Sequence, residues 1–106
     1  MMNIVSAAKA SRVWIQKWNE RLARHGVKAN ARVPESDEIN KAVTHLEGPT
    51  HVASLTVWGT GMVEFIVLDL ASQEDVVVRD EEFHTVAELE AVMDRCGNEF
   101  VALVRQ

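Results

Sequence analysis

The side chains that could do chemistry are few, and their spacing matches no established catalytic or metal-binding motif. Four histidines and one cysteine are scattered along the chain: His25, His45, His51, His84 and Cys96. His45 and His51 flank a Gly48-Pro49 turn and could approach each other across a hairpin, yet no pair has the close spacing of a zinc motif. We therefore predict no metal site and no cofactor.

Two further groups of residues could take part in catalysis, but their positions favour structural roles. Cys96 lies at the predicted end of a helix, where the helix dipole disfavours a thiolate, and on that helix's apolar stripe. Asp80, Glu81 and Glu82 are adjacent carboxylates before a helix, which is typical of a solvated acidic loop. No phosphate-binding loop, dinucleotide fingerprint or nucleophile elbow occurs. The sequence predicts a protein that is not an enzyme; a metal-dependent enzyme built on His45, His51 and glutamates stays as the third alternative.

Length and composition bound the class of protein. The chain has 106 residues, of which 47% are hydrophobic and 25% charged, as expected for a single globular domain over residues 1–106. Its single cysteine can form no internal disulfide, and its first residues do not resemble a signal peptide. No apolar run approaches the roughly 20 residues that a membrane span needs. These features predict a cytoplasmic protein that binds no membrane.

Charge is distributed unevenly along the chain. Residues 1–45 contain eight Lys/Arg and four Asp/Glu (net +4), whereas residues 46–106 contain three and twelve (net −9). The acidic part repels nucleic acid and favours a basic protein surface as partner, although an acidic surface can also serve solubility alone. The basic residues of the first helix have no stacking aromatics between them, so nucleic acid is not predicted as a partner: Lys9, Arg12, Lys17, Arg21 and Arg24.

The periodicity of apolar residues along the chain predicts helices and strands of an α+β fold. Apolar residues recur at helical spacing over about residues 3–24, with Trp14 and Trp18 on the buried stripe. Strict alternation of apolar and polar residues predicts a strand over residues 27–33, and residues 39–46 form a second predicted strand. We expect an antiparallel sheet of about four to six strands with this N-terminal amphipathic helix.

The C-terminal part predicts one strand, one helix and a last strand. Residues 76–80 are rich in valine and predict a strand. Thr85 and Glu88 form a capping box that begins a second, short helix, and Gly97 is the predicted end of that helix. The β-branched and apolar residues of 98–105 then predict the last strand.

The clearest signal is a β-hairpin over residues 51–70. Two β-rich runs flank Gly59-Thr60-Gly61, and a three-residue loop with a left-handed glycine is a common hairpin connection. Pairing Trp58 with Met62 places six apolar side chains together on one face, as a core requires: Ala53, Leu55, Val57, Val63, Phe65 and Val67. A two-residue loop would mix the two faces, so we predict the three-residue loop.

The second face of this hairpin is also apolar and carries Thr56, Trp58, Met62, Glu64, Ile66 and Leu68. Either a helix covers it or a partner does, and packing of the first helix or oligomerisation is the favoured interpretation, since such sheets usually carry a helix on one face. A structural or regulatory homodimer that uses this face is therefore the alternative function. For a protein that binds another protein, the predicted binding residues are Trp58, Met62, Glu64, Ile66, Asp69, Asp80, Glu81 and Glu82.

The order of these features resembles the TriTu family of bacterial immunity proteins. The resemblance rests on Leu55-Thr56-Val57-Trp58-Gly59-Thr60-Gly61, a strand ending in Val67-Leu68-Asp69, a short valine strand, and Phe83-His84-Thr85 before an acidic helix. It covers roughly residues 50–95, with weaker support from Trp14 and Trp18. The family usually has a charged or polar residue where this chain has Gly59.

The resemblance implies a small cytoplasmic immunity protein without a catalytic site. Proteins of this family protect the producing cell from the ADP-ribosyltransferase domain of an Rhs-type polymorphic toxin that acts on elongation factor Tu. The implied mechanism is occlusion, in which an acidic and apolar surface covers a basic, nucleotide-binding cleft of the toxin domain.

Overall fold

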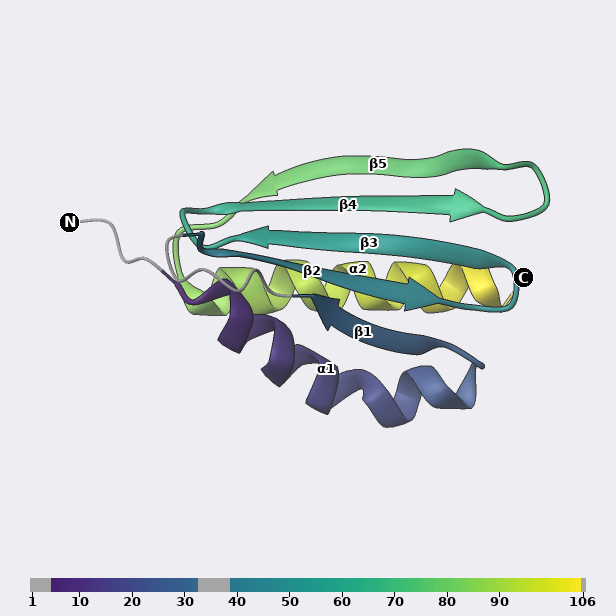
Figure 1. Cartoon of the computed structure of the whole chain (residues 1–106), viewed down its shortest axis with the longest axis horizontal. Coiled ribbons are helices and arrows are strands. Elements are labelled where there is room, and N and C mark those ends of the chain that lie inside the picture. Colours follow the sequence, from purple (N-terminus) through teal and green to yellow (C-terminus); the bar gives the residue numbers. More distant parts are fainter. Residues whose placement is uncertain (1–4, 33–38, 106) are drawn as a thin grey trace.

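The computed structural model describes residues 5–32 and 39–105, which form five strands and two helices. Their order along the chain is α1 (Ala7–Arg24), β1 (Lys28–Arg32), β2 (Lys41–Glu47), β3 (His51–Trp58), β4 (Met62–Asp69), β5 (Glu74–Glu82) and α2 (Val86–Val104). All neighbouring strands are antiparallel, and their order in the sheet is β1-β2-β3-β4-β5. The sheet is therefore a meander with β1 and β5 at its edges (Figure 1). This confirms the predicted α+β class.

The first helix forms as its apolar spacing predicts. The Ser6 hydroxyl caps α1 by accepting a hydrogen bond from the Lys9 N–H, and Gly26, with φ of 72°, follows its end. One stripe of side chains is buried: Ala7, Ser11, Trp14, Trp18 and Leu22. The predicted residues 3 and 4 of this helix lie outside the described residues, as does residue 33 of the first predicted strand.

The central hairpin has the predicted register. Trp58 pairs with Met62 across the three-residue loop, and Leu55 lies opposite Phe65. Gly61 has φ of 128°, which a side chain would strain. The six apolar side chains of the predicted core face are all buried. The edge strand β5 is longer than predicted and is interrupted by a register shift between Val67 and Leu68 of β4.

The second helix differs most from the prediction. Thr85 caps it as expected, and Glu88 accepts a hydrogen bond from the His84 N–H. However, α2 has 19 residues and continues through Gly97 to Val104, so the predicted stop at Gly97 and the last predicted strand over 98–105 are both wrong. A Cβ atom at Gly97 would lie 2.9 Å from the rings of Trp14 and Trp18. The glycine thus permits close contact between the helices.

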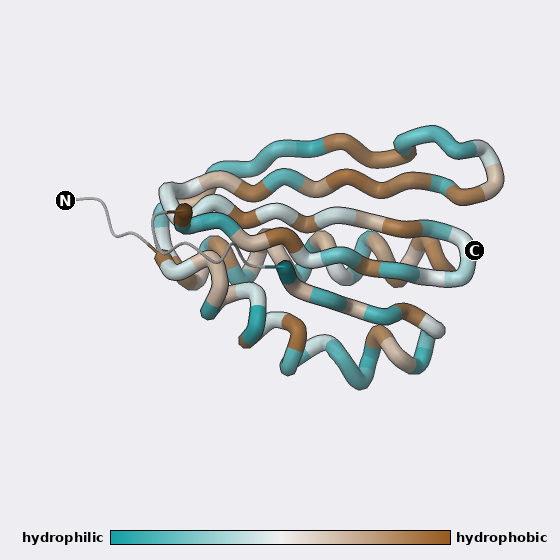
Figure 2. The backbone as a smooth tube through the Cα atoms, viewed as in Figure 1, coloured by the Kyte–Doolittle hydropathy of each residue, from teal (hydrophilic) through white to brown (hydrophobic). Residues whose placement is uncertain are grey.

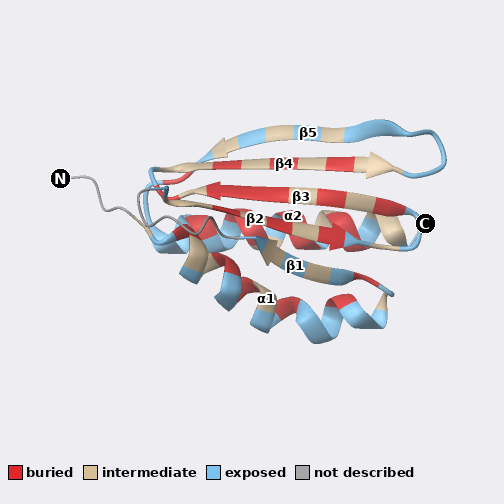
Figure 3. Ribbon diagram, viewed as in Figure 1, coloured by how far each residue is buried: buried red, intermediate tan, exposed pale blue. Residues whose placement is uncertain are grey.

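Both helices pack on the same face of the sheet. The core is one cluster, and α1 packs mainly against β1 and β2 while α2 packs against β3 and β4. Figure 3 shows this burial as alternating red and tan along the central strands. Packing of the first helix on the second sheet face, one half of the favoured interpretation, is therefore wrong, and oligomerisation through that face stays a prediction. Within residues 5–32 and 39–105, neither helix is both long and apolar enough to cross a membrane.

Candidate functional site

The sheet face that points away from both helices is the main candidate site. We call it the open face, because no helix or strand among the described residues packs on it. It consists of the side chains of alternate strand residues: Lys28, Asn30, Arg32, Lys41, Val43, His45, Glu47, Val52, Ser54, Thr56, Trp58, Met62, Glu64, Ile66, Leu68, Val78, Asp80 and Glu82. A shallow depression of about 320 Å³ is lined in part by His45, Val52, Ile66 and Leu68 of this face.

The register arranges the open face by polarity across the sheet. Reading one row from β1 to β5, the side chains are Arg32, Val43, Thr56, Glu64 and Asp80. The row of Lys41, Trp58, Met62 and Glu82 repeats this order. The two remaining rows are mixed, because Glu47 lies on β2 and Val78 lies on β5. Figure 2 shows the mixture of brown and teal along β4 and β5. Such an apolar centre with a charged rim is typical of a protein-binding surface.

Trp58 is held firmly at the hairpin tip. The Lys41 ammonium lies 5.3 Å from the centre of its ring, on the neighbouring strand. Behind the tip, the Asn40 side chain accepts a hydrogen bond from Ala7 N–H (2.8 Å) and donates one to the Val5 carbonyl (2.7 Å). A side chain at Gly59 would overlap Asn40 and Val5, which explains the glycine after the tryptophan. The start of α1 therefore fixes the strand end that presents Trp58.

The acidic side of the open face contains a pair of like charges. Glu64 on β4 lies directly opposite Asp80 on β5, and Glu82 lies opposite Met62. Like charges that face each other across two strands repel, so we expect this pair to lower the stability of the free protein. A basic group of a partner placed between them would remove that repulsion.

Two of the eight predicted binding residues lie outside the open face. Glu81 points to the helix side, where its carboxylate lies 2.9 Å from Arg95 and 3.4 Å from Arg79. Asp69 ends β4 on the helix side, accepts a hydrogen bond from Ala71 N–H, and lies 3.8 Å from His51 Nε2. The structure thus brings together Trp58, Met62, Glu64, Ile66, Asp80 and Glu82.

The chemically reactive side chains do not converge. His45 lies on the open face, whereas His51 points to the helix side. Among the described residues, no three of His, Cys, Asp and Glu come together as metal ligands. Cys96 is buried, and this burial raises the pKa of its thiol to about 11 although Arg79 lies nearby. At neutral pH the thiol is therefore protonated and a poor nucleophile.

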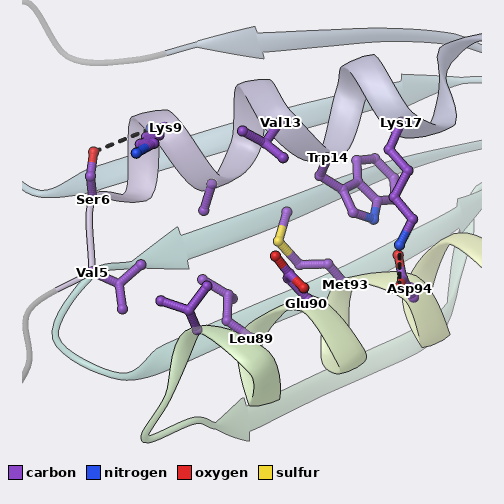
Figure 4. A pocket seen from close by; sticks show the side chains of 12 residues that line it. Val5, Ser6, Lys9, Val13, Trp14, Lys17, Leu89, Glu90, Met93 and Asp94 are labelled. Atoms are coloured by element: carbon purple, nitrogen blue, oxygen red, sulfur yellow. Dashed lines mark hydrogen bonds and ion pairs between the residues drawn. The ribbon is translucent and has the colours of Figure 1, made fainter.

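A second candidate is the groove between the helices, with a volume of about 800 Å³ (Figure 4). Its walls are mainly apolar and include Val13, Leu89 and Met93. The ion pair between Lys17 and Asp94, at 2.8 Å, lies at one end of the groove. Its size suits a small ligand, but the ionisable side chains at that end are paired with each other. The groove was not predicted, because it depends on how the two helices meet.

Comparison with known proteins identifies one family. A search of curated proteins finds no match to the chain. A family model described as "Immunity protein TriTu" matches residues 10–99. That range includes most of α1, the whole sheet and the greater part of α2. The chain therefore belongs to the TriTu family of immunity proteins.

Proposed function

We propose that this protein confers immunity by binding a toxin domain, an ADP-ribosyltransferase of a polymorphic toxin, and covering its active-site cleft with the open face. Family membership supports an immunity function. The observation that carries the binding mode is the open face itself, a sheet surface with an apolar centre around Trp58 and Ile66. In this proposal the protein acts in the cytoplasm of the producing cell and catalyses no reaction.

The polarity of the open face supports a basic cleft as the target. An apolar centre supplies the hydrophobic contact area, and tryptophan is among the residues that contribute most to protein interfaces. Acidic groups at Glu64, Asp80 and Glu82 would lie over basic residues that bind the nucleotide phosphates in the toxin domain. Complementary charges speed association and exclude wrong partners more than they strengthen the final complex.

Coexpression with the toxin domain encoded beside the chain tests this proposal. The unsubstituted protein should rescue growth, and Ile66→Asp should abolish rescue, because it places a charge in the centre of the open face. Ile66 is half-buried. Val13→Asp is the control, since Val13 is an exposed apolar residue on α1, away from the open face. Failure of the unsubstituted protein to rescue would reject the proposal, and equal effects of the two substitutions would reject the open face as the binding site.

A homodimer is the second candidate, and one observation favours it. Two open faces related by a twofold axis parallel to the strands would place the basic β1 side of one copy over the acidic β5 side of the other. Light scattering of the purified protein separates the two functions. A stable dimer that Ile66→Asp converts to a monomer would support the homodimer, whereas a monomer that forms a one-to-one complex with the toxin domain would exclude it.

A further inference from the structure

The outer edge of β5 offers a second type of contact beside the open face. β5 is the last strand of the sheet, and among the described residues no further strand pairs with it. Residues 77–82 pair regularly with residues 67–62 of β4, so this part of the edge is straight and continuous. Figure 3 shows β5 as the most exposed strand together with β1. The exposed fraction of Val78 is 68%, the highest among the large apolar side chains.

The hydrogen-bond pattern identifies which backbone groups are free. The Phe83 N–H donates to the Gly61 carbonyl, so residues 83 and 61 form a hydrogen-bonded pair. Because such pairs alternate along an antiparallel ladder, Glu81 and Arg79 also bond to β4. The N–H and C=O groups of Val78, Asp80 and Glu82 then point outward from the sheet. These three residues also place their side chains on the open face.

The edge is held in position from the helix side. The Arg79 guanidinium lies 2.7 Å from Glu99 of α2, and Glu81 lies 2.9 Å from Arg95 of the same helix. These pairs tie alternate residues of β5 to α2 and leave the outer backbone groups free. A strand that is ordered before binding loses less conformational entropy when a partner pairs with it.

We infer that β5 accepts an added strand from the partner, an extended basic segment of the toxin domain that pairs with residues 78–82. Strand addition is an established mode of peptide recognition. β5 carries five acidic side chains and one basic side chain, so a second copy of the same edge would be repelled. A segment that places basic side chains opposite Asp80 and Glu82 and an apolar one opposite Val78 fits both charge and shape. This inference rests on the proposed function.

Proline at position 80 tests the added strand directly. The Asp80 N–H makes no bond to β4, so Asp80→Pro should leave the fold intact while it removes an outward donor and blocks the edge. Asp80→Ala is the matched control, because it removes the same charge but keeps the N–H. We expect Asp80→Pro to weaken binding of the inactivated toxin domain by at least about tenfold more than Asp80→Ala, the effect of one backbone hydrogen bond to the edge. Equal losses would overturn the inference.

Amide hydrogen exchange of the unsubstituted protein gives a second measurement that needs no variant. The amides of Val78, Asp80 and Glu82 should exchange fast in the free protein and slow by about a hundredfold or more in the complex. A complex without this protection would reject the added strand and leave the proposed function intact. If the toxin domain does not bind at all, the proposed function fails. A capped ten-residue peptide of alternating lysine and valine then tests the edge alone, and no protection at millimolar peptide would reject strand addition.

Discussion

At the scale of single residues, Gly97 decides how closely the two helices approach each other. A Cβ atom at this position would lie 2.9 Å from the rings of both Trp14 and Trp18, which are themselves stacked at 5.4 Å between centroids. Neither ring can move easily in a packed core. We expect Gly97→Ala to lower the free energy of unfolding by about 1–3 kcal/mol, the usual cost of overpacking. Urea denaturation monitored by tryptophan fluorescence measures this change.

The sign of the Gly97→Ala effect separates packing from helix propensity. In an exposed helix, glycine to alanine is stabilising by about 1 kcal/mol. Asn98→Ala serves as the control, because Asn98 is exposed one residue further along α2 and its replacement affects mainly propensity. A stabilised Gly97→Ala protein would contradict the close helix contact described above.

Asp94 links the two helices through its charge. Burial disfavours the charged carboxylate, but hydrogen bonds from Lys17 and Trp18 outweigh it and hold the pKa of Asp94 below its ordinary value of 3.8. A depressed pKa stabilises the fold above the unfolded-state value and loses this contribution as the pH falls below it. We expect Asp94→Asn to flatten the loss of stability between about pH 5 and pH 2. Denaturation midpoints measured across this range, with Glu90→Asn as an exposed control on α2, check the prediction; parallel pH profiles would contradict it.

At the scale of elements, β4 and β5 place two like charges, Glu64 and Asp80, opposite each other, an arrangement expected to destabilise the pair of strands. Glu64 and Asp80 face each other in a pair without backbone hydrogen bonds, where side chains are closest. Glu64→Gln should therefore raise the free energy of unfolding by about 0.2–1 kcal/mol. The same variant should weaken toxin binding, so stability and binding would change in opposite directions.

Glu47→Gln is the matched control for this prediction. Glu47 also lies on the open face, but the residue opposite it on β1 is Lys28, which carries the opposite charge. Removing that charge should leave stability unchanged or slightly lower. Thermal denaturation at low and high salt distinguishes the variants, because the difference at Glu64 should shrink as salt screens the repulsion. Equal shifts for both variants would show that the facing pair has no special cost.

The same elements show what the sequence could and could not predict. The hairpin register was predictable because alternation with period two and a glycine loop leave only one pairing that puts Leu55, Val57 and Phe65 together. The end of α2 was not predictable, because Gly97 looks locally like a helix stop. The reason for a glycine there is its contact with Trp14 and Trp18 of α1, which the local sequence does not reveal. For the site, the sequence pattern of residues 80–82 indicates an acidic loop, whereas in the structure they belong to β5, which sends Glu81 to the face opposite that of Asp80 and Glu82.

At the scale of the whole molecule, the placement of both helices on one side leaves the opposite face of the sheet uncovered by any helix among the described residues. The sequence showed that both hairpin faces were apolar, but only the packing of α1 and α2 determines which face remains open. The same arrangement divides the charges. The basic residues of α1 lie on the helix side of the sheet, whereas Glu64, Asp80 and Glu82 lie on the open face. The basic cleft proposed for the toxin domain would therefore meet acidic groups on one side of the open face.

This charge distribution should control the rate of association more than the lifetime of the complex. Glu64→Gln with Asp80→Asn should lower the association rate constant for the toxin domain about tenfold at low salt, with a smaller change in the dissociation rate. The difference should disappear as the Debye length falls to about 3 Å at 1 M salt. Glu20→Gln with Glu90→Gln is the control, because it changes the net charge equally but on the helices. Equal slowing by both double variants, measured by stopped-flow fluorescence, would show that net charge rather than the open face directs association.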